Sequence, residues 1–311
     1  MTDIPESDDL RGRLAEAQLF PPDAIAGARF ERLGGLTNRN YRVNMEGERL
    51  VLRIAGEGSD TYIDRAVERH NAEVAARAGV GAELLWFDSG GGTMITRFVD
   101  GSITMDGEKF RDLGAVARAG RAFRRMHDWR EPFRSHFDLF AKMDEYLALL
   151  QALNAPIPDG YGEVQKEAGI VRQRLTERPP PLAPSHCDPL AENFLDTGER
   201  MVIVDWEYSG MNDPMWDLGD LSVEAGFGPE QDEALLSAYF DGRAVPRAVR
   251  GRMVLYKAMC DLLWTLWGVI QVANRNPVDD FWAYAVNRFE RCRRLMGTTD
   301  YASALDWVKR G

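Results

Sequence analysis

Four polar residues in the middle of the chain have the types and spacing of a metal site beside a general base. His186, Asp188 and Asn193 follow the order H-x-D-x-x-x-x-N, and Asp205 ends the apolar run that comes next. Carboxylate and amide oxygens suit a hard cation such as Mg²⁺, and a further Asp can accept a proton from an attacking hydroxyl. The same order of base Asp, metal Asn and metal Asp serves phosphoryl transfer. Spacing alone leaves a second interpretation open, because Asp and Asn are also ordinary turn residues.

The elements around these residues would bring them together. The segment from Asn193 to Asp205 predicts two short strands that turn at 197–198, so both residues fall at the open end of a hairpin. Asp188, in the loop just before, can reach the same end. The hairpin lies among helical patterns at 110–128, 136–154, 160–177, 230–241, 246–272 and 278–296.

The N-terminal part of the chain has a different pattern. Alternating apolar residues predict a hairpin over 41–54, and a Gly-rich turn separates two more strands within 82–101. Between these hairpins, an Ala-rich segment predicts a helix that begins at an N-cap Asp60 and ends at Gly79. We therefore expect an α+β fold with a small N-terminal lobe, 1–98, and a mostly helical lobe, 99–311. Small-molecule sites tend to lie in the cleft between such units.

Composition limits the possible partners. The 311 residues include 38 Lys and Arg against 49 Asp and Glu, a net charge of −11. An acidic chain favours neither nucleic acid nor an anionic membrane surface as a partner. The three cysteines show no disulfide or zinc spacing, and the acidic N-terminus lacks a signal-peptide core. The longest apolar tract contains Asp261 and is shorter than the roughly 20 residues of a membrane span. We expect a cytoplasmic protein, as either a monomer or a homodimer.

Several motifs resemble a known superfamily. "HCDPLAENFL" and "IVDWEYSG" resemble the catalytic signature of the aminoglycoside phosphotransferase and choline kinase superfamily, which has the protein-kinase-like fold. "VDWEYSGMNDPMWDLGDLSVE" is closer still to the choline and ethanolamine kinases, in their bacterial form. "GGLTNRNYRV" is similar to the nucleotide loop of choline kinases, and "WTLWG" to their substrate-pocket helix. The resemblance covers roughly residues 30 to 290.

The resemblance assigns roles around the catalytic loop. It implies that Asp188 is the catalytic base and that Asn193 and Asp205 bind Mg²⁺. His186 would keep the loop in shape, and Asp217 in "WDLGD" would support it. From the residues alone, His186 could be an ordinary buried histidine and Asp217 a helix cap.

ATP is the nucleotide that the resemblance implies, and an acidic chain must hold its phosphates with local donors. Gly34 and Gly35 lie at a strand turn, where a backbone without Cβ atoms can approach a phosphate. Thr37 and Asn38 would add side-chain donors. A Gly-Gly pair alone is as easily a simple hairpin turn.

The resemblance also implies a basic residue on the next strand that contacts the ATP phosphates and pairs with a helix acid. Here the basic residue is Arg53, which offers forked donors. Glu68 is the expected acid, and Glu73 is the alternative. The segment with Thr96 and Phe98 would connect the lobes and contact adenine through its backbone.

The acceptor end is predicted from aromatic residues. Trp264 and Trp267 share one helix face, and Tyr284, Tyr208 and Glu224 lie in neighbouring motifs. A quaternary ammonium requires ring faces and one neutralising acid, although tryptophans on an apolar helix also suit a plain core. The resemblance implies that these five residues form the substrate pocket.

We therefore expect an ATP- and Mg²⁺-dependent phosphotransferase that acts on a small amino alcohol, choline or ethanolamine. Kinases for another hydroxylated amine, such as an aminoglycoside or thiamine, remain an alternative, as does a non-catalytic binding protein with this fold. One departure concerns the acceptor: eukaryotic choline kinases carry a polar residue two positions after the catalytic Asp, whereas this chain has Leu190.

Overall fold

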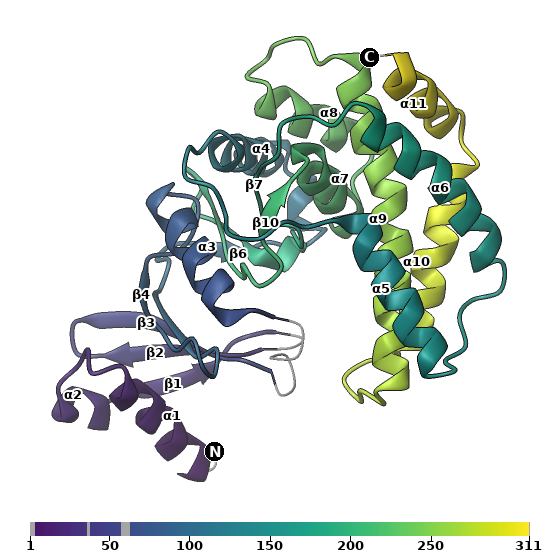
Figure 1. The fold of residues 1–311 in the computed structure, drawn as a ribbon. Helices are drawn as coiled ribbons and strands as arrows, with labels where there is room; N and C mark the ends of the chain where they lie inside the picture. The colour runs from purple at the N-terminus through teal and green to yellow at the C-terminus, as the bar shows by residue number, and fades with distance from the viewer. Residues whose placement is uncertain (1–3, 36–37, 57–62, 311) are drawn as a thin grey trace.

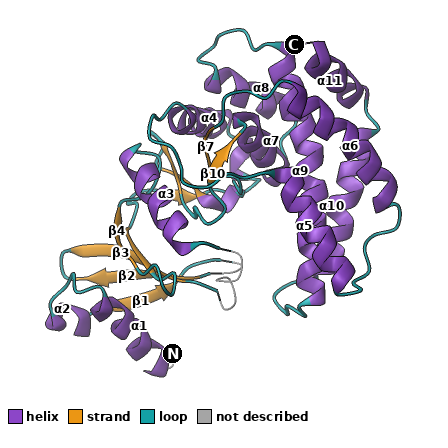
Figure 2. Ribbon diagram, in the orientation of Figure 1, coloured by secondary structure: helices purple, strands orange, loops and turns teal. Residues whose placement is uncertain are grey.

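The structure is a computed structural model that describes residues 4–35, 38–56 and 63–310. Strands gather in the N-terminal part of the molecule, and helices make up most of the remainder (Figures 1 and 2). The five-stranded antiparallel sheet has the order β1 (Arg29–Arg32), β2 (Arg39–Met45), β3 (Glu48–Ile54), β5 (Met94–Arg97) and β4 (Leu84–Phe87). The two predicted N-terminal hairpins, β2–β3 and β4–β5, are confirmed.

Three helices accompany this sheet. Two of them, α1 (Ile4–Glu16) and α2 (Pro22–Ala26), bury Leu10, Leu14 and Ile25 in a small core with strand residues. The third, α3 (Arg65–Arg77), begins one turn later than predicted, because Asp64 caps it by accepting from the next amides. The predicted cap, Asp60, lies outside the described residues. Gly79 follows the helix with a positive φ of 73°, as its predicted stop requires.

The remaining helices build the larger part of the molecule. They are α4 (Leu113–His127), α5 (Leu139–Ala152), α6 (Tyr161–Glu177), α7 (Pro214–Glu224), α8 (Pro229–Tyr239), α9 (Arg247–Ala273), α10 (Phe281–Met296) and α11 (Thr299–Arg310). Six of these match the predicted helical patterns, whereas α7 and α11 were not predicted. Nearly all of α7 is buried, so it shows no alternation of apolar and polar faces.

Short strands lie within the helical part. The predicted hairpin is present as β8 (Phe194–Asp196) and β9 (Met201–Ile203), and β6 (Ile103–Thr104) adds a third strand. A separate pair joins β7 (Ala183–Ser185) to β10 (Gly210–Asn212). The amide of Ile203 donates to the carbonyl of Val80 at 2.7 Å, so the turn after α3 is joined directly to the hairpin.

The long helix α9 is the central packing element of the helical part. Its length and composition would allow it to cross a membrane, but 83% of its most apolar window is buried inside the protein. It packs against α10, α11, α7 and α5. The expected α+β architecture is thus confirmed, with a small antiparallel sheet joined to a helical part that contains the hairpin.

Candidate active site

One cavity of about 820 Å³ extends from the sheet into the helical part. Most of the predicted site residues line it together: Gly34, Gly35, Arg53, Thr96, Phe98, Asp188, Asn193, Asp205, Tyr208, Glu224, Trp264, Trp267 and Tyr284. Asn38, Glu68, His186 and Asp217 lie outside its lining, and Thr37 is outside the described residues. A cavity shared by the glycine turn, the hairpin end and the aromatic helix is what a two-substrate site requires.

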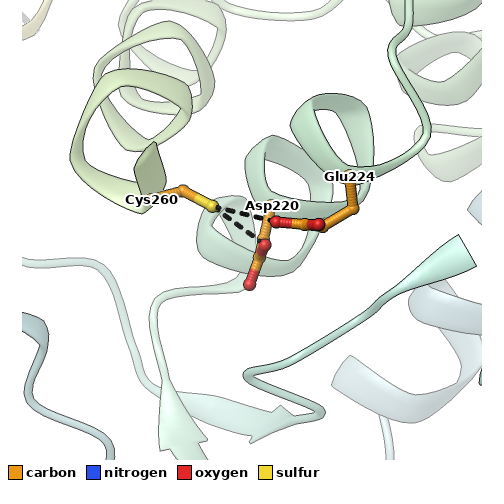
Figure 3. Close-up of side chains that lie close together, drawn as sticks. All are labelled: Asp220, Glu224 and Cys260. Carbon is orange, nitrogen blue, oxygen red and sulfur yellow. Dashed lines mark hydrogen bonds between the residues drawn. The ribbon is translucent and has the colours of Figure 1, made fainter. Parts of the chain in front are cut away.

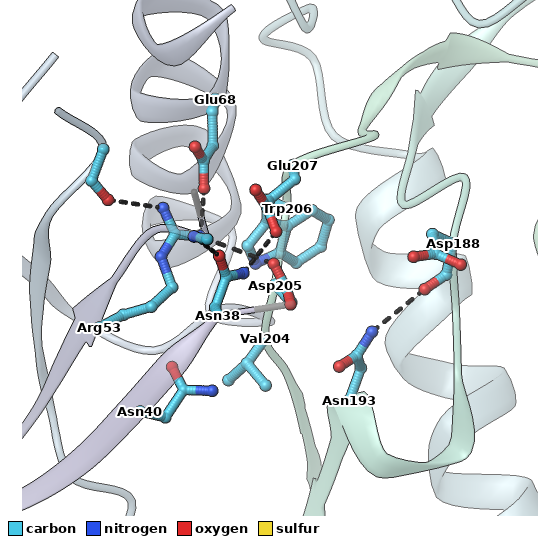
Figure 4. A network of polar contacts seen from close by, with 12 residues as sticks. Asn38, Asn40, Arg53, Glu68, Asp188, Asn193, Val204, Asp205, Trp206 and Glu207 are labelled. Atoms are coloured by element: carbon cyan, nitrogen blue, oxygen red, sulfur yellow. Dashed lines mark hydrogen bonds and ion pairs between the residues drawn. The ribbon is translucent and has the colours of Figure 1, made fainter. Parts of the chain in front are cut away.

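The hairpin end holds Asp188 and Asn193 close together. Asn193 ends a 3₁₀ turn, Ala191–Asn193, and its side-chain amide donates to the carbonyl of Asp188 at 3.2 Å (Figure 4). Its own carbonyl accepts from the amide of Val204 at 2.9 Å, which brings the end of β9 to the same point. The chain there continues into Asp205, so three oxygen-bearing side chains face one end of the cavity.

Asp217 supports this loop from the first turn of α7. It is fully buried and accepts from the backbone amides of His186 (2.8 Å) and Cys187 (2.9 Å), and His127 Nε2 lies 3.0 Å away. The cap of α7 is Asp213, so the helix-cap alternative for Asp217 is wrong. The two carboxylate oxygens instead fix the backbone just before Asp188.

His186 is buried between the catalytic loop and the hairpin and contacts both. Its Nε2–H donates to the carbonyl of Val204 at 2.9 Å, and its ring centroid lies 4.7 Å from that of Trp206. Burial lowers the pKa of His186, against the opposing charge of Asp217. The ring lies outside the cavity lining, so its contacts are those of a residue that shapes the loop.

Two residues beside the site have backbone conformations that non-glycine residues rarely adopt. Cys187 has φ of 68° and Asp205 has φ of 69°. Such strain costs on the order of 1 kcal/mol and gathers at functional sites. The Cys187 thiol is fully buried, and burial raises its pKa, so it is poorly suited to act as a nucleophile.

The surroundings of Asp188 raise the pKa of its carboxyl group. Burial, followed by the negative charges of Glu224 and Glu207, raises the pKa of Asp188 from 3.8 to about 7, while Arg288 opposes the shift. A carboxylate that titrates near neutral pH can both accept and release a proton under working conditions.

Arg53 on β3 meets the predicted helix acid. Arg53 and Glu68 form a buried ion pair, and the Arg53 Nη1 also lies 3.6 Å from Asp205 Oδ1. Arg53 Nη2 donates to the carbonyl of Gly92 at 3.1 Å. Glu73, the alternative partner, pairs instead with Arg69 on the outer face of α3 at 2.9 Å.

Asp205 has features of a cation ligand. Its Oδ1 is buried and accepts no hydrogen bond from the described residues. Burial, followed by the charge of Glu207, raises the pKa of Asp205, while Arg53 opposes the shift. Asp205, Glu68 and Glu207 each place an oxygen within 4.8 Å of the others. A buried carboxylate oxygen without a hydrogen-bond donor among the described residues fits a Mg²⁺ ligand, and Asn193 and Asp205 would hold this ion.

The glycine turn is built as expected, but its side-chain donors differ from the prediction. Gly35 has φ of 149°, and a Cβ there would lie 2.5 Å from the carbonyl oxygen of Asn38, so only glycine fits. Asn38 is buried and donates to Glu207, so the expectation that it donates to phosphate is wrong. Asn40 lines the cavity in its place and donates to the carbonyl of Gly34 at 3.0 Å.

Both residues predicted to contact adenine line the cavity: Thr96 lies near the end of β5, and Phe98 follows that strand. The amide of Phe98 donates to the carbonyl of Arg49 at 3.0 Å. This amide is therefore occupied, and Phe98 has only its carbonyl and ring to offer to a base. The ring of Phe98 already lies 4.8 Å from the guanidinium of Arg42.

At the far end, perpendicular aromatic rings form the cavity wall. Trp264 lies edge-on to Tyr208 (5.8 Å, 84°) and to Trp267 (6.3 Å, 88°). Trp267 in turn lies edge-on to Tyr284 (5.8 Å, 69°). Rings that meet at right angles leave several faces available to one small cation.

Glu224 is not the single free acid that the sequence predicted. Arg288 forms ion pairs with both of its oxygens, one through Nη2 and Oε2 at 2.7 Å. The Arg288 guanidinium also lies 4.7 Å from the ring centroid of Tyr284. The acid and one ring face are thus already shared with a resident cation. Sequence reasoning missed Arg288, although it lies one helical turn after Tyr284.

Further acids lie behind Glu224. Asp220, Glu224 and Cys260 place ligand atoms within 4.8 Å of one another (Figure 3). Asp220 is fully buried, accepts from the Cys260 thiol at 3.0 Å, and keeps its Oδ2 unpartnered among the described residues. Burial, followed by the charges of Glu224 and Asp188, raises the pKa of Asp220. Asp220 therefore keeps its proton more readily than an ordinary carboxyl, and it lies outside the cavity lining, next to the Glu224–Arg288 pair.

Known proteins resemble this chain over most of its length. Residues 30–252 match the family described as "Phosphotransferase enzyme family". The chain belongs to this family. It is also similar to a structure of a choline/ethanolamine kinase family protein from Mesorhizobium loti, with 54% identity, coverage of 98% of this chain and 99% of the other, and a TM-score of 0.88.

More distant relatives of this phosphotransferase include LicA proteins. The protein LicA of Haemophilus influenzae is 27% identical over 273 residues, which cover 86% of this chain and 79% of LicA. The structure of choline kinase LicA from Streptococcus pneumoniae is 28% identical, covers 86% of this chain and 92% of the other, and has a TM-score of 0.73. The predicted protein-kinase-like fold, the kinase class and the choline/ethanolamine kinase family are confirmed.

Proposed function

We propose that this phosphotransferase uses Mg²⁺ and ATP to phosphorylate the hydroxyl group of a small amino alcohol, choline or ethanolamine. The observation that carries the proposal is the cavity that joins the glycine turn, Asp188 and the aromatic wall. The names of the relatives, choline kinase and ethanolamine kinase, support the same substrate class.

In this proposal the N-terminal lobe, 1–98, binds the nucleotide. Backbone amides at Gly34 and Gly35 approach the phosphates, and Arg53 contributes positive charge beside Asp205. The connector at Thr96 and Phe98 lies along the base. Mg²⁺, when bound, would neutralise phosphate charge at Asn193 and Asp205.

The lobe 99–311 supplies the base and the acceptor pocket. Asp188 accepts the hydroxyl proton as the substrate oxygen forms a bond to the γ-phosphorus, and the bond from that phosphorus to ADP breaks. Positioning and electrostatic stabilisation provide most of the acceleration in such transfers. The pKa of about 7 suits Asp188 to this task.

The substrate ammonium would lie against the faces of Trp264, Trp267 and Tyr208 by cation–π attraction. Glu224 contributes negative charge to the region, although Arg288 holds its oxygens. We also propose a cytoplasmic location, which three free, buried cysteines support.

An acceptor panel tests the proposal. ADP release would be measured with choline, ethanolamine, thiamine and kanamycin, with Asp188→Asn as the inactive control. We expect turnover with choline or ethanolamine that the variant lacks. Turnover with kanamycin or thiamine alone would show that choline and ethanolamine are not the acceptors and that the other amine is. The absence of turnover with all four compounds would overturn the amine substrate class.

A further inference from the structure

Helix α3 presents a buried polar face to the segment that follows β9. Arg65, Glu68 and Asn71 recur every three residues and are 4%, 1% and 0% exposed. Buried polar side chains need partners, so such a face is costly unless the opposite surface is matched to it. The opposite surface consists of Asp205, Glu207 and Ser209, which lie in the irregular segment and turn between β9 and β10.

The first two contacts are ionic. Arg65 Nη1 lies 2.7 Å from both Glu207 Oε2 and Glu68 Oε2. Glu68 pairs with Arg53, which lies 3.6 Å from Asp205. Two cations and three carboxylates therefore form a chain of ion pairs that begins at Asp205 and ends at Glu207. Figure 4 shows the part of it made by Arg53, Glu68, Asp205 and Glu207.

The third contact is made by Asn71, six residues after Arg65 on α3. Asn71 Nδ2 donates to the carbonyl of Ser209 at 3.0 Å and to its hydroxyl at 3.1 Å. Asn71 Oδ1 accepts from the amide of Arg134 at 3.0 Å. The helix is thus attached to the catalytic segment at both ends of its buried face.

Glu207 extends the same network to the glycine turn. Its Oε1 accepts from Asn38 Nδ2, while its Oε2 accepts from Arg65. Asn38 Oδ1 accepts from the amide of Gly56 at 3.1 Å, and its backbone carbonyl lies against Gly35. Burial alone would raise the pKa of Glu207, but the charge of Arg53 and the hydrogen bonds from Arg65 and Asn38 lower it.

We infer that Glu207 is a positioning residue that fixes the glycine turn, through Asn38, and α3, through Arg65, to the strand end that carries Asp205. The inference rests on the proposed function, because it concerns nucleotide placement for phosphoryl transfer. With this connection in place, the Arg53–Glu68 pair is set before ATP binds.

A different role for Glu207 would be direct metal ligation, since its oxygen lies within 4.8 Å of those of Glu68 and Asp205. The two roles predict different effects of changing Asn38. If Glu207 is a positioning residue, the hydrogen bond that the Asn38 amide donates to it is essential. If Glu207 is a metal ligand, removing that hydrogen bond should have little effect.

The test exchanges donor and acceptor across the contact. Glu207→Gln loses the acceptor for Asn38, and Asn38→Asp places two carboxylates together. The double variant restores one donor–acceptor pair, because the new amide at position 207 can donate to the new carboxylate at position 38 and still accept from Arg65. We expect each single variant to weaken binding of a non-hydrolysable ATP analogue with Mg²⁺ by about tenfold, and the double variant to recover at least about fivefold.

The controls separate positioning from general damage. The KM for the amino alcohol should change less than about twofold in every variant, and Arg69→Met, on the outer face of α3, should behave as wild type. If Asn38→Asp does not fold, Asn38→Ser must reproduce the loss of Glu207→Gln, and the two together must lose no more than either alone.

Loss in Glu207→Gln with no effect of Asn38 substitution would overturn the inference in favour of a metal ligand, as would single losses that simply multiply in the double variant. Because nucleotide binding is measured without an acceptor, a wrong substrate assignment would leave this test intact and would appear only in the acceptor panel.

Discussion

Arg288 holds both carboxylate oxygens of Glu224, and its guanidinium lies 4.7 Å from the ring centroid of Tyr284. This is the combination of acid and ring face that an ammonium group would otherwise use. An incoming amino alcohol must therefore share Glu224 with a resident cation, and the remaining aromatic wall carries more of the recognition.

Removing this cation should affect both stability and chemistry. In Arg288→Met, Glu224 remains buried beside Asp220 and Asp188 without its counter-ion. Breaking a buried pair in this way costs about 3–5 kcal/mol of unfolding free energy. Because Arg288 opposes the raised pKa of Asp188, the pH profile of kcat should also move to higher pH. Chemical denaturation and pH–rate profiles measure the two effects.

The matched control is Arg293→Met on the same helix, where the pair with Glu290 is about half exposed on both sides. Exposed pairs contribute roughly 0–1 kcal/mol, so this variant should resemble wild type. Equal effects of the two substitutions would show that the Glu224–Arg288 pair has no special role.

Activity should depend on the ionisation of Asp188. The carboxyl must be deprotonated to accept the hydroxyl proton, and its pKa is raised to about 7. The rate should therefore rise as pH increases through about 7 and level off above it. A kcat that stays constant from pH 5 to 9 would exclude Asp188 as the titrating base.

The same pKa shift predicts that Asp188 lowers stability at high pH. The native state binds this proton more tightly than the unfolded chain, whose carboxyl titrates near 3.8, so unfolding free energy falls as pH rises from about 4 to 7. Asp188→Asn should then stabilise the inactive protein by roughly 1–2 kcal/mol at pH 8, since partial exposure reduces the cost. At pH 4 the gain should disappear. Thermal unfolding at both pH values measures the difference, and a destabilised variant at pH 8 would contradict the shift.

Asp217 should matter for the loop rather than for binding. Asp217→Asn loses one of the two acceptors that hold the amides of His186 and Cys187. An unmatched buried amide costs about 1–3 kcal/mol, and a displaced Asp188 should lower kcat at least tenfold with little change in either KM. Steady-state kinetics and denaturation check this, with the exposed substitution Asp300→Asn as the control.

Sequence patterns predicted the parts of the site that depend on local order. The spacing from His186 to Asn193 predicted the loop, and alternation predicted the hairpin that brings Asp205 to it. Gly35 was predicted from the need for close backbone approach, and its φ of 149° meets that need. These features are encoded by neighbouring residues.

Other parts depend on how distant elements pack. Asn38 is buried whereas Asn40 lines the cavity, and the partner of Asn38 lies 169 residues away. Arg288 lies one turn after Tyr284 on α10, but this spacing does not predict whether that face of the helix packs against Glu224 or faces solvent. The buried polar face of α3 could not be predicted from the sequence either, because its charged residues resemble those of a solvent-exposed helix face.

Product analysis tests the central claim most directly. Wild-type protein and Asp188→Asn would be incubated with Mg²⁺, ATP and choline or ethanolamine, and the products resolved by phosphorus NMR and mass spectrometry. We expect one O-phosphorylated amino alcohol for each ADP formed by wild type, and none with the variant. ADP formed without a phosphorylated amino alcohol, or equal product from Asp188→Asn, would contradict it.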